Sequence, residues 1–204
     1  MFTGIVQGTY GVTSVHRELD LLTYAVTLDA ERVDGLEVGA SVSIDGVCQT
    51  VVSIEGHRVS FDAIRETLDR TTLGALQAGD QVAVERSACV GDEVGGHDVS
   101  GHVIGQGEVV LARKEGHVCV LGIGVPSSWM KYVLNKGFIA VDGSSLTVCD
   151  ATADGSFVVH LIPETLRLTR LGQKRLGDRL NVELDPRTVA IVDTVERVME
   201  ERES

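Results

Sequence analysis

The chain lacks the features that mark several large classes of protein. Its 204 residues include only three prolines and 4% aromatic residues, and no run of about 18 apolar residues predicts a membrane-spanning helix. The first twelve residues contain no basic segment followed by an apolar one, so no secretory signal is predicted. Four cysteines are present without a C-x-x-C pair or zinc-site spacing, which predicts free thiols in a reducing cytoplasm. They are Cys48, Cys89, Cys119 and Cys149.

Basic residues are also scarce. Eighteen Lys and Arg stand against 30 Asp and Glu, giving a formal net charge of −12. This balance argues against nucleic acid and against an anionic membrane as partners, because both require clustered positive charge. Apolar residues make up 43% of the chain, which excludes a disordered acidic protein. Twenty-three glycines predict many tight turns between short strands.

An internal repeat is present along the chain. A shift of 97 residues aligns Asp45–Val51 with Asp142–Val148, and Thr3–Val6 with Ser100–Val103. A shift of 98 residues aligns further segments in the same order. These are Glu66–Leu68 with Glu164–Leu166, Leu73-Gly74 with Leu171-Gly172, Gly79-Asp80 with Gly177-Asp178, and Val84-Glu85 with Val182-Glu183. The sequence therefore predicts a tandem duplication, with domains at about 1–97 and 98–187, followed by a tail at 188–204.

Each half is predicted to be built from short strands. Asp45-Gly46 and Glu55-Gly56 are typical hairpin turns. The short β-branched segments before, between and after these turns predict strands at Val42–Ile44, Val51–Ile54, Arg58–Asp62 and Gln81–Glu85. Strands of this length and spacing favour small closed barrels, because closure removes sheet edges. Short helical turns are expected after Glu66–Leu68 and Glu164–Leu166 and near Pro126–Tyr132. The predicted fold class is all-β, with two similar barrels.

The tail has a different pattern. Apolar residues recur at three- and four-residue steps between Thr188 and Glu200, which predicts a helix with one apolar stripe. The stripe consists of Ile191, Val192, Val195, Val198 and Met199. It could pack on its own barrel or join copies of the chain, and the pattern alone does not favour either.

Small polar side chains recur at equivalent places in the two halves. Cys48 and Thr50 lie two residues apart on a predicted strand, so they face the same side, and Ser145 and Thr147 repeat the arrangement. Small residues packed inside a barrel are the simpler explanation for either pair alone. The repetition in otherwise diverged halves favours a functional pair.

Three ionisable residues break the repeat, which suggests roles confined to one half. Ordinary alternatives exist for each: a hydrogen-bonded histidine, a turn-capping carboxylate and a solvated amine. They are His102 in place of Ile5, Asp185 in place of Ser87, and Lys136 in place of Gly39. His102 could move protons near neutral pH. The histidines near Gly95–His102 lack further ligands at suitable spacing, so no metal site is predicted.

Several motifs together resemble the riboflavin synthase family of the α-chain type. They are Met1–Val6, Gly95–His97 with Ser100–His102, Lys136–Ile139, Asp142-Gly143 with Ser145–Thr147, and His160–Leu166. The resemblance extends into the tail, at Val192–Val198. Gln49, Asp98 and Ser144 depart from the residues that are usual in the family.

The resemblance implies two six-stranded antiparallel barrels and a C-terminal helix that helps to build a homotrimer. It implies a transferase that dismutates two molecules of 6,7-dimethyl-8-ribityllumazine. The products would be riboflavin and 5-amino-6-ribitylamino-2,4(1H,3H)-pyrimidinedione, formed with no cofactor and no metal. Each barrel would bind one lumazine, and the N-barrel of one subunit would face the C-barrel of a neighbour. Lumazine synthase is a candidate partner for association.

The family's binding contacts carry over residue by residue. Those of the N-barrel fall on Gly4, Ile5, Val6, Cys48, Gln49, Thr50, Asp62, Ala63, Ile64, Arg65, Glu66 and Thr67. Those of the C-barrel fall on Gly101, His102, Val103, Lys136, Ser145, Leu146, Thr147, His160, Leu161, Ile162, Pro163, Glu164 and Thr165. The expected catalytic groups are Cys48, His102, Ser145, Thr147 and Asp185, with Asp185 orienting Ser145 or shuttling a proton. The alternative is a non-catalytic lumazine- or flavin-binding antenna relative.

Overall fold

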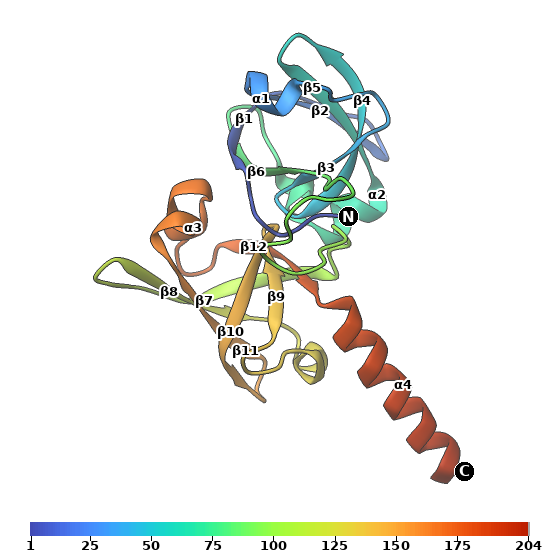
Figure 1. Ribbon diagram of the computed structural model, residues 1–204, viewed down its shortest axis with the longest axis vertical. Helices are drawn as coiled ribbons and strands as arrows, with labels where there is room; N and C mark the ends of the chain where they lie inside the picture. The colour runs from blue at the N-terminus through green and yellow to red at the C-terminus, as the bar shows by residue number, and fades with distance from the viewer. Residues whose placement is uncertain (204) are drawn as a thin grey trace.

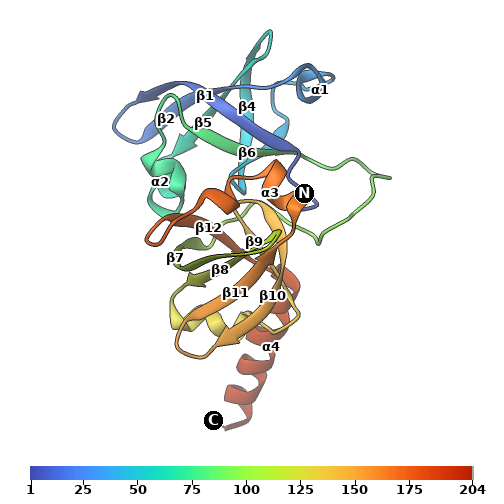
Figure 2. The same ribbon diagram turned by 90° about the vertical axis from the view of Figure 1, so that its left-hand side faces the viewer.

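The computed structural model describes residues 1–203, except the side chains of residues 115 and 203. It consists of two closed antiparallel barrels, one above the other, and a long helix that projects from the second (Figures 1 and 2). The N-barrel strands, in order around the barrel, are β1 (Gly8–Arg17), β2 (Leu21–Thr27), β5 (Arg58–Ile64), β4 (Val47–Glu55), β3 (Ser41–Ile44) and β6 (Gln81–Arg86). The C-barrel strands are β10 (Ser144–Thr152), β11 (Ser156–Leu161), β8 (Val118–Gly124), β7 (Gly105–Glu115), β12 (Arg179–Leu184) and β9 (Phe138–Val141).

Short helices occupy equivalent places in the two halves. The N-half contains α1 (Ala30–Val33), α2 (Arg65–Arg70) and the 3-10 helix η1 (Thr72–Ala75). The C-half contains η2 (Ser127–Tyr132), α3 (Pro163–Leu168) and η3 (Leu171–Gln173). The structure thus confirms the two predicted barrels, their duplication, and the helical turns that follow the two Glu-Thr-Leu segments.

Each barrel has its own core, formed by alternate residues of its strands. In β5, Val59, Phe61 and Ala63 point inward and are buried, while Asp62 and Ile64 face outward. Burial of such side chains contributes about 1.5–3 kcal/mol for each large one. The two cores are separate clusters, which is what two duplicated folding units require.

Two hairpin turns bring the barrels together. Asp45-Gly46 joins β3 to β4 and Asp142-Gly143 joins β9 to β10, and all four residues have positive φ, as a type I′ turn requires. A Cβ at Gly46 would lie only 2.5 Å from the amide nitrogen of Gly143. The two turns therefore touch through backbone, and glycine permits the close approach.

Two segments outside the strands also link the halves. We call residues 1–7 the N-arm and residues 96–104 the C-arm. Phe2 and Val99 pair through backbone bonds of 2.7 and 3.1 Å, and both side chains are buried with Ala140. The N-terminus accordingly lies between the barrels (Figures 1 and 2).

The tail forms α4 (Pro186–Glu203), which confirms the predicted helix. Val189, near its start, packs on the C-barrel core. Farther along, Ile191, Val195, Val198 and Met199 are exposed, so most of the apolar stripe does not pack on its own barrel. None of the helices in the described part of the chain is long and apolar enough to cross a membrane.

Candidate functional site

Each barrel has a cavity at the start of its short helix. The N-pocket, about 270 Å³, is lined by Val47, Cys48, Glu66, Thr67, Arg70, Thr71, Gly101, His102 and Val103. The C-pocket, about 140 Å³, is lined by Gly4, Ile5, Val6, Ser144, Ser145, Ile162, Glu164, Thr165, Leu168 and Thr169. Apart from Ile162, every lining residue of one pocket has its repeat-equivalent in the other. The duplication has therefore produced two matched pockets.

The lining side chains of the two pockets differ in chemistry. His102, Arg70 and Cys48 in the N-pocket correspond to Ile5, Leu168 and Ser145 in the C-pocket. The N-pocket therefore carries an imidazole, a guanidinium and a thiol. The C-pocket carries two aliphatic side chains and a hydroxyl.

The arms cross between the barrels, which corrects the grouping expected from the sequence. Gly4, Ile5 and Val6 belong to the N-half but line the C-pocket, and Gly101–Val103 line the N-pocket. Backbone bonds fix this exchange: the Ser145 amide donates to the Gly4 carbonyl at 2.8 Å, and the Cys48 amide donates to the Gly101 carbonyl at 3.0 Å. Each pocket is completed by the other half of the chain.

Glycine is required at both crossing points. Gly4 and Gly101 have φ of 75° and 79°. A Cβ at Gly4 would lie 2.5 Å from the Ser145 Cβ, and one at Gly101 would lie 2.6 Å from the Cys48 Cβ. Only glycine allows the arm backbone to lie against these strands without strain.

Ser145 forms a hydrogen bond with a histidine that the expected site did not include. Its hydroxyl lies 2.6 Å from Nδ1 of His97, whose ring stacks on Phe138 with centroids 5.1 Å apart. Nε2 of His97 is buried and has no hydrogen-bond partner in the described part of the chain. Burial lowers the pKa of His97, although Asp185 and Glu183 oppose the effect. His97 is therefore neutral near pH 7 and able to accept a proton.

Asp185 does not orient Ser145 as expected. Its carboxylate caps α4, accepting the amide and hydroxyl of Thr188 at 3.1 and 2.6 Å and the amide of Arg187 at 3.3 Å. Burial alone would raise the pKa of Asp185, but these bonds hold the pKa below its usual range. Asp185 is linked to the site only through its charge, which raises the pKa of His97 against the effect of burial.

The other expected residues divide between the pocket surroundings and the barrel interiors. Thr50, Asp62, Ile64, Arg65, Lys136, Thr147, His160 and Pro163 are exposed. Gln49, Ala63, Leu146 and Leu161 are buried in the barrels. Lys136 lines neither pocket and has positive φ, and its amide donates to the Val148 carbonyl. Arg70, Thr71, Leu168 and Thr169 line the pockets but lie just beyond the expected segments.

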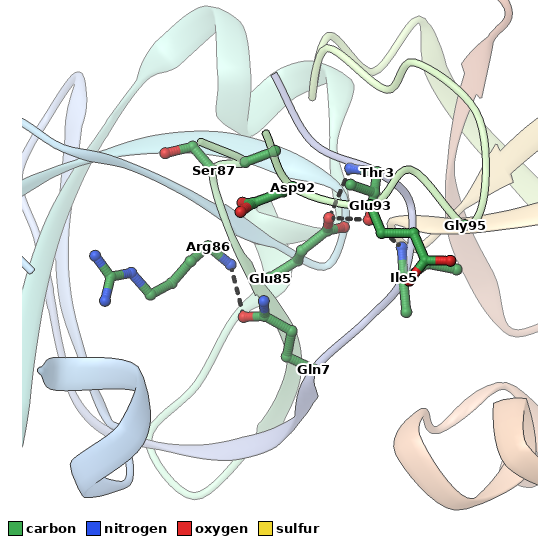
Figure 3. A pocket seen from close by; sticks show the side chains of 10 residues that line it. Thr3, Ile5, Gln7, Glu85, Arg86, Ser87, Asp92, Glu93 and Gly95 are labelled. Atoms are coloured by element: carbon green, nitrogen blue, oxygen red, sulfur yellow. Dashed lines mark hydrogen bonds between the residues drawn. The ribbon is translucent and has the colours of Figure 1, made fainter. Parts of the chain in front are cut away.

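A larger cavity, about 410 Å³, lies beside the N-arm (Figure 3). Glu85 faces it, with its carboxylate bonded to Thr3, while the Arg86 guanidinium points away. Asp92 and Glu93 of the segment between the barrels also line it. Glu85 holds the N-arm and Asp92 accepts the amide of Cys89 at 2.7 Å, so these carboxylates have structural partners and volume alone does not identify the reactive site. The described residues hold no group of three or more metal-ligating side chains, and all four cysteines are free.

Comparison with known proteins agrees with the duplication. The model of the lumazine binding domain matches residues 3–87 and again residues 100–185. Riboflavin synthase of Escherichia coli (strain K12) is 50% identical over all of this chain and 96% of its own length. Riboflavin synthase of Buchnera aphidicola subsp. Schizaphis graminum is 42% identical over 98% of this chain and 96% of its own length.

Solved structures of LumP have the same fold. The complex of LumP with 6,7-dimethyl-8-(1'-D-ribityl) lumazine aligns with a TM-score of 0.81 at 26% identity, covering 90% of this chain and 98% of LumP. The complex with riboflavin aligns with a TM-score of 0.84 at 25% identity, covering 91% of this chain and all of LumP.

Proposed function

The chain belongs to the riboflavin synthase family, and we propose that its N-pocket and C-pocket each hold one lumazine during the reaction. The activity is the dismutation of two molecules of 6,7-dimethyl-8-ribityllumazine. One molecule donates a four-carbon unit to the other, giving riboflavin and 5-amino-6-ribitylamino-2,4(1H,3H)-pyrimidinedione. The lumazine-binding units are residues 1–97 and 98–187.

The observation that carries this proposal is the pair of repeat-equivalent pockets with unequal chemistry. Two copies of one substrate require two similar cavities, and different roles for donor and acceptor require different side chains. His102 and Arg70 in the N-pocket against Ile5 and Leu168 in the C-pocket supply that difference. Holding both molecules in place removes much of the entropic barrier of a bimolecular step.

We place the first proton transfer at the pair of Ser145 and His97. A C–H bond of the C7 methyl of one lumazine breaks, its electron pair delocalises into the ring, and the proton passes to this pair directly or through water. The hydrogen bond of 2.6 Å and the lowered pKa of His97 support this role. Cys48 or a water molecule in the N-pocket is the candidate nucleophile that adds to the other lumazine. His102 assists there, and the exposed Thr147 is a candidate hydrogen-bond donor at the rim.

A homotrimer would bring the N-pocket of one subunit to the C-pocket of its neighbour. The exposed apolar stripe of α4 supports such an assembly, because Ile191, Val195 and Val198 recur at helical spacing without a partner in the described part of the chain. Ion pairs from Lys131 to Asp193 and Glu196, at 3.4 and 2.5 Å, brace the helix against η2. Residues 188–204 are then the trimerisation segment, and light scattering should give three times the mass of the chain.

The direct test is incubation of the protein with 6,7-dimethyl-8-ribityllumazine alone. Riboflavin should form without any added cofactor or metal, with one molecule produced for every two lumazines consumed. Bound but unconverted lumazine would instead indicate an antenna-type binding protein. Identity of 50% to a riboflavin synthase over all of this chain favours the enzyme.

Location and further partners follow from this function. We expect the enzyme to act in the cytoplasm, where its four free thiols are compatible with a reducing environment. Association with lumazine synthase stays a prediction, and co-elution of the two purified proteins would test it.

A further inference from the structure

Two buried carboxylates hold the crossing arms in the same way. Glu85, on β6, accepts the Thr3 amide at 2.7 Å and the Thr3 hydroxyl at 2.8 Å (Figure 3). It also accepts the Gly4 amide at 3.1 Å. Glu183, on β12, accepts the Ser100 amide and hydroxyl, both at 2.7 Å, and the Gly101 amide at 2.9 Å. Each carboxylate thus makes three hydrogen bonds to the arm of its own half.

The arm hydroxyls extend each contact by one residue, into a pocket. Thr3 Oγ1 accepts the amide of Ile5, and Ser100 Oγ accepts the amide of His102, both at 3.2 Å. Ile5 and His102 are one of the repeat-equivalent pairs at which the two pockets differ. Each carboxylate is thus linked, through one hydroxyl, to the backbone of a pocket residue: Glu85 to Ile5 and Glu183 to His102.

We propose that Glu85 and Glu183 are positioning residues that act across the barrels: Glu85 shapes the C-pocket and Glu183 shapes the N-pocket. Glu85 belongs to the N-barrel, but the arm it holds contacts Ser145 of the C-pocket through Gly4. Glu183 belongs to the C-barrel, but the arm it holds contacts Cys48 of the N-pocket through Gly101. This inference rests on the proposed role of the two pockets as lumazine sites.

Burial makes these contacts strong. Glu85 and Glu183 are only 3% and 4% exposed, so water competes little for their carboxylates, least of all at the buried bonds to Gly4 and Gly101. Charge-assisted hydrogen bonds of this kind are about twice as strong as neutral ones. Glutamine has the same shape but presents an N–H₂ group where one carboxylate oxygen accepts an N–H, so Glu→Gln loosens the arm with little change in volume.

The experiment compares Glu85→Gln with Glu183→Gln in the full-length protein, using alkylation of Cys48 to report on the N-pocket. Riboflavin is the probe ligand, and peptide mass spectrometry separates Cys48 from the other three thiols. In the unaltered protein, riboflavin should slow the alkylation of Cys48. Glu183→Gln should raise the half-protecting riboflavin concentration about tenfold, whereas Glu85→Gln should leave it within about twofold.

Turnover of lumazine supplies the second readout. Both variants should raise KM about tenfold, because either loosened arm weakens one of the two sites. The matched control is Glu55→Gln, an exposed glutamate paired with Arg58 at a hairpin, which should change neither quantity. Protection of Cys48 lost in Glu85→Gln but kept in Glu183→Gln would overturn the proposal, since each carboxylate would then serve its own barrel.

Milder variants cover the case in which Glu→Gln prevents folding. Thr3→Ala and Ser100→Ala remove only the hydroxyl, and we expect the same crossed pattern with about threefold effects. Equal loss of Cys48 protection in both would indicate general loosening and would also overturn the proposal. If riboflavin failed to protect Cys48 in the unaltered protein, the assignment of the N-pocket as a lumazine site would fail instead.

Discussion

The N-barrel and the C-barrel hold their exchanged arms in the same way but line their pockets with different side chains. Glu85 and Glu183 make the same three bonds, and Gly4 and Gly101 lie against equivalent strands at the same positive φ. Such positions are fixed by backbone geometry, which both halves must satisfy. The side chains that line the two pockets are free of this constraint, and they differ at His102 and Ile5 and at Arg70 and Leu168.

The interiors of the barrels differ as well. In the N-barrel the buried Tyr24 hydroxyl donates to Gln49 at 3.2 Å, and the amide of Gln49 donates to the Cys48 carbonyl at 2.9 Å. The repeat-equivalent residues in the C-barrel are Leu121 and Leu146. A polar pair in one core thus corresponds to an apolar pair in the other, and the polar one connects to the strand that carries Cys48.

The largest expected effect concerns His97, which is hydrogen-bonded to Ser145 of the C-pocket. His97→Ala should lower kcat about 100-fold or more, because it removes the base bonded to Ser145, and general acid–base groups contribute at least that much. The measurement is riboflavin formation at saturating lumazine. His102→Ala, which removes the histidine of the N-pocket, should lower kcat at least tenfold less, because His102 is exposed. Equal losses of kcat in the two variants would show that His102 is as important for proton transfer as His97.

The arm glycines should behave alike. Gly4→Ala and Gly101→Ala should each lower the free energy of unfolding by about 2–4 kcal/mol, since positive φ and a close Cβ contact add together. Urea unfolding measures the effect. Gly79→Ala is the control, because Gly79 also has positive φ but nothing lies within 4 Å of a Cβ there, so only about 1–2 kcal/mol should be lost. Unequal effects at Gly4 and Gly101 would show that the arms are not equivalent.

The barrels themselves were predictable because their signals are local. Asp45-Gly46 and Asp142-Gly143 specify hairpins, and the repeated segments require that both halves fold alike. The helix at 188–200 followed from its apolar spacing.

The crossing of the arms has no such local signal. A duplication shows that Gly4 corresponds to Gly101, but it is equally consistent with Gly4 lying on Cys48 or on Ser145. Contacts within one half and contacts exchanged between halves give the same repeat. His97 was missed for a related reason: a shift of 97 residues places its counterpart before Met1, so no comparison between halves could mark it. Arg70 lies beyond the segment that the family motifs cover.

The polar pair in the N-barrel should be replaceable only as a pair. Gln49→Leu makes the N-core resemble the C-core but leaves the buried Tyr24 hydroxyl without its acceptor, which should cost about 1–3 kcal/mol of stability. The double variant Tyr24→Phe/Gln49→Leu should recover most of this loss, and a double-mutant cycle in urea measures the coupling. Turnover should change less than threefold in the double variant. Additive losses would show that the hydrogen bond does not stabilise the barrel.

The smallest expected effect concerns the two touching turns and depends on pH. Burial, together with the charge of Asp142, raises the pKa of Asp45 to about 7, whereas Asp142 has an ion pair with Lys174 at 3.0 Å. The folded state therefore holds a proton on Asp45 that the unfolded chain releases near pH 4, so this stability is present below pH 4 and is lost as pH rises through about 7. Between pH 6 and 7 the loss should be about 1 kcal/mol, measured by urea unfolding. Asp45→Asn should remove this slope, because an amide side chain does not titrate. The turn should be kept, because the Asn oxygen can still accept from the Ala83 amide. Asp142→Asn should also flatten it, but at a cost in stability at every pH, because Lys174 loses its partner. An unchanged slope in Asp45→Asn would assign the pH dependence to other groups and remove this distinction between the two turns.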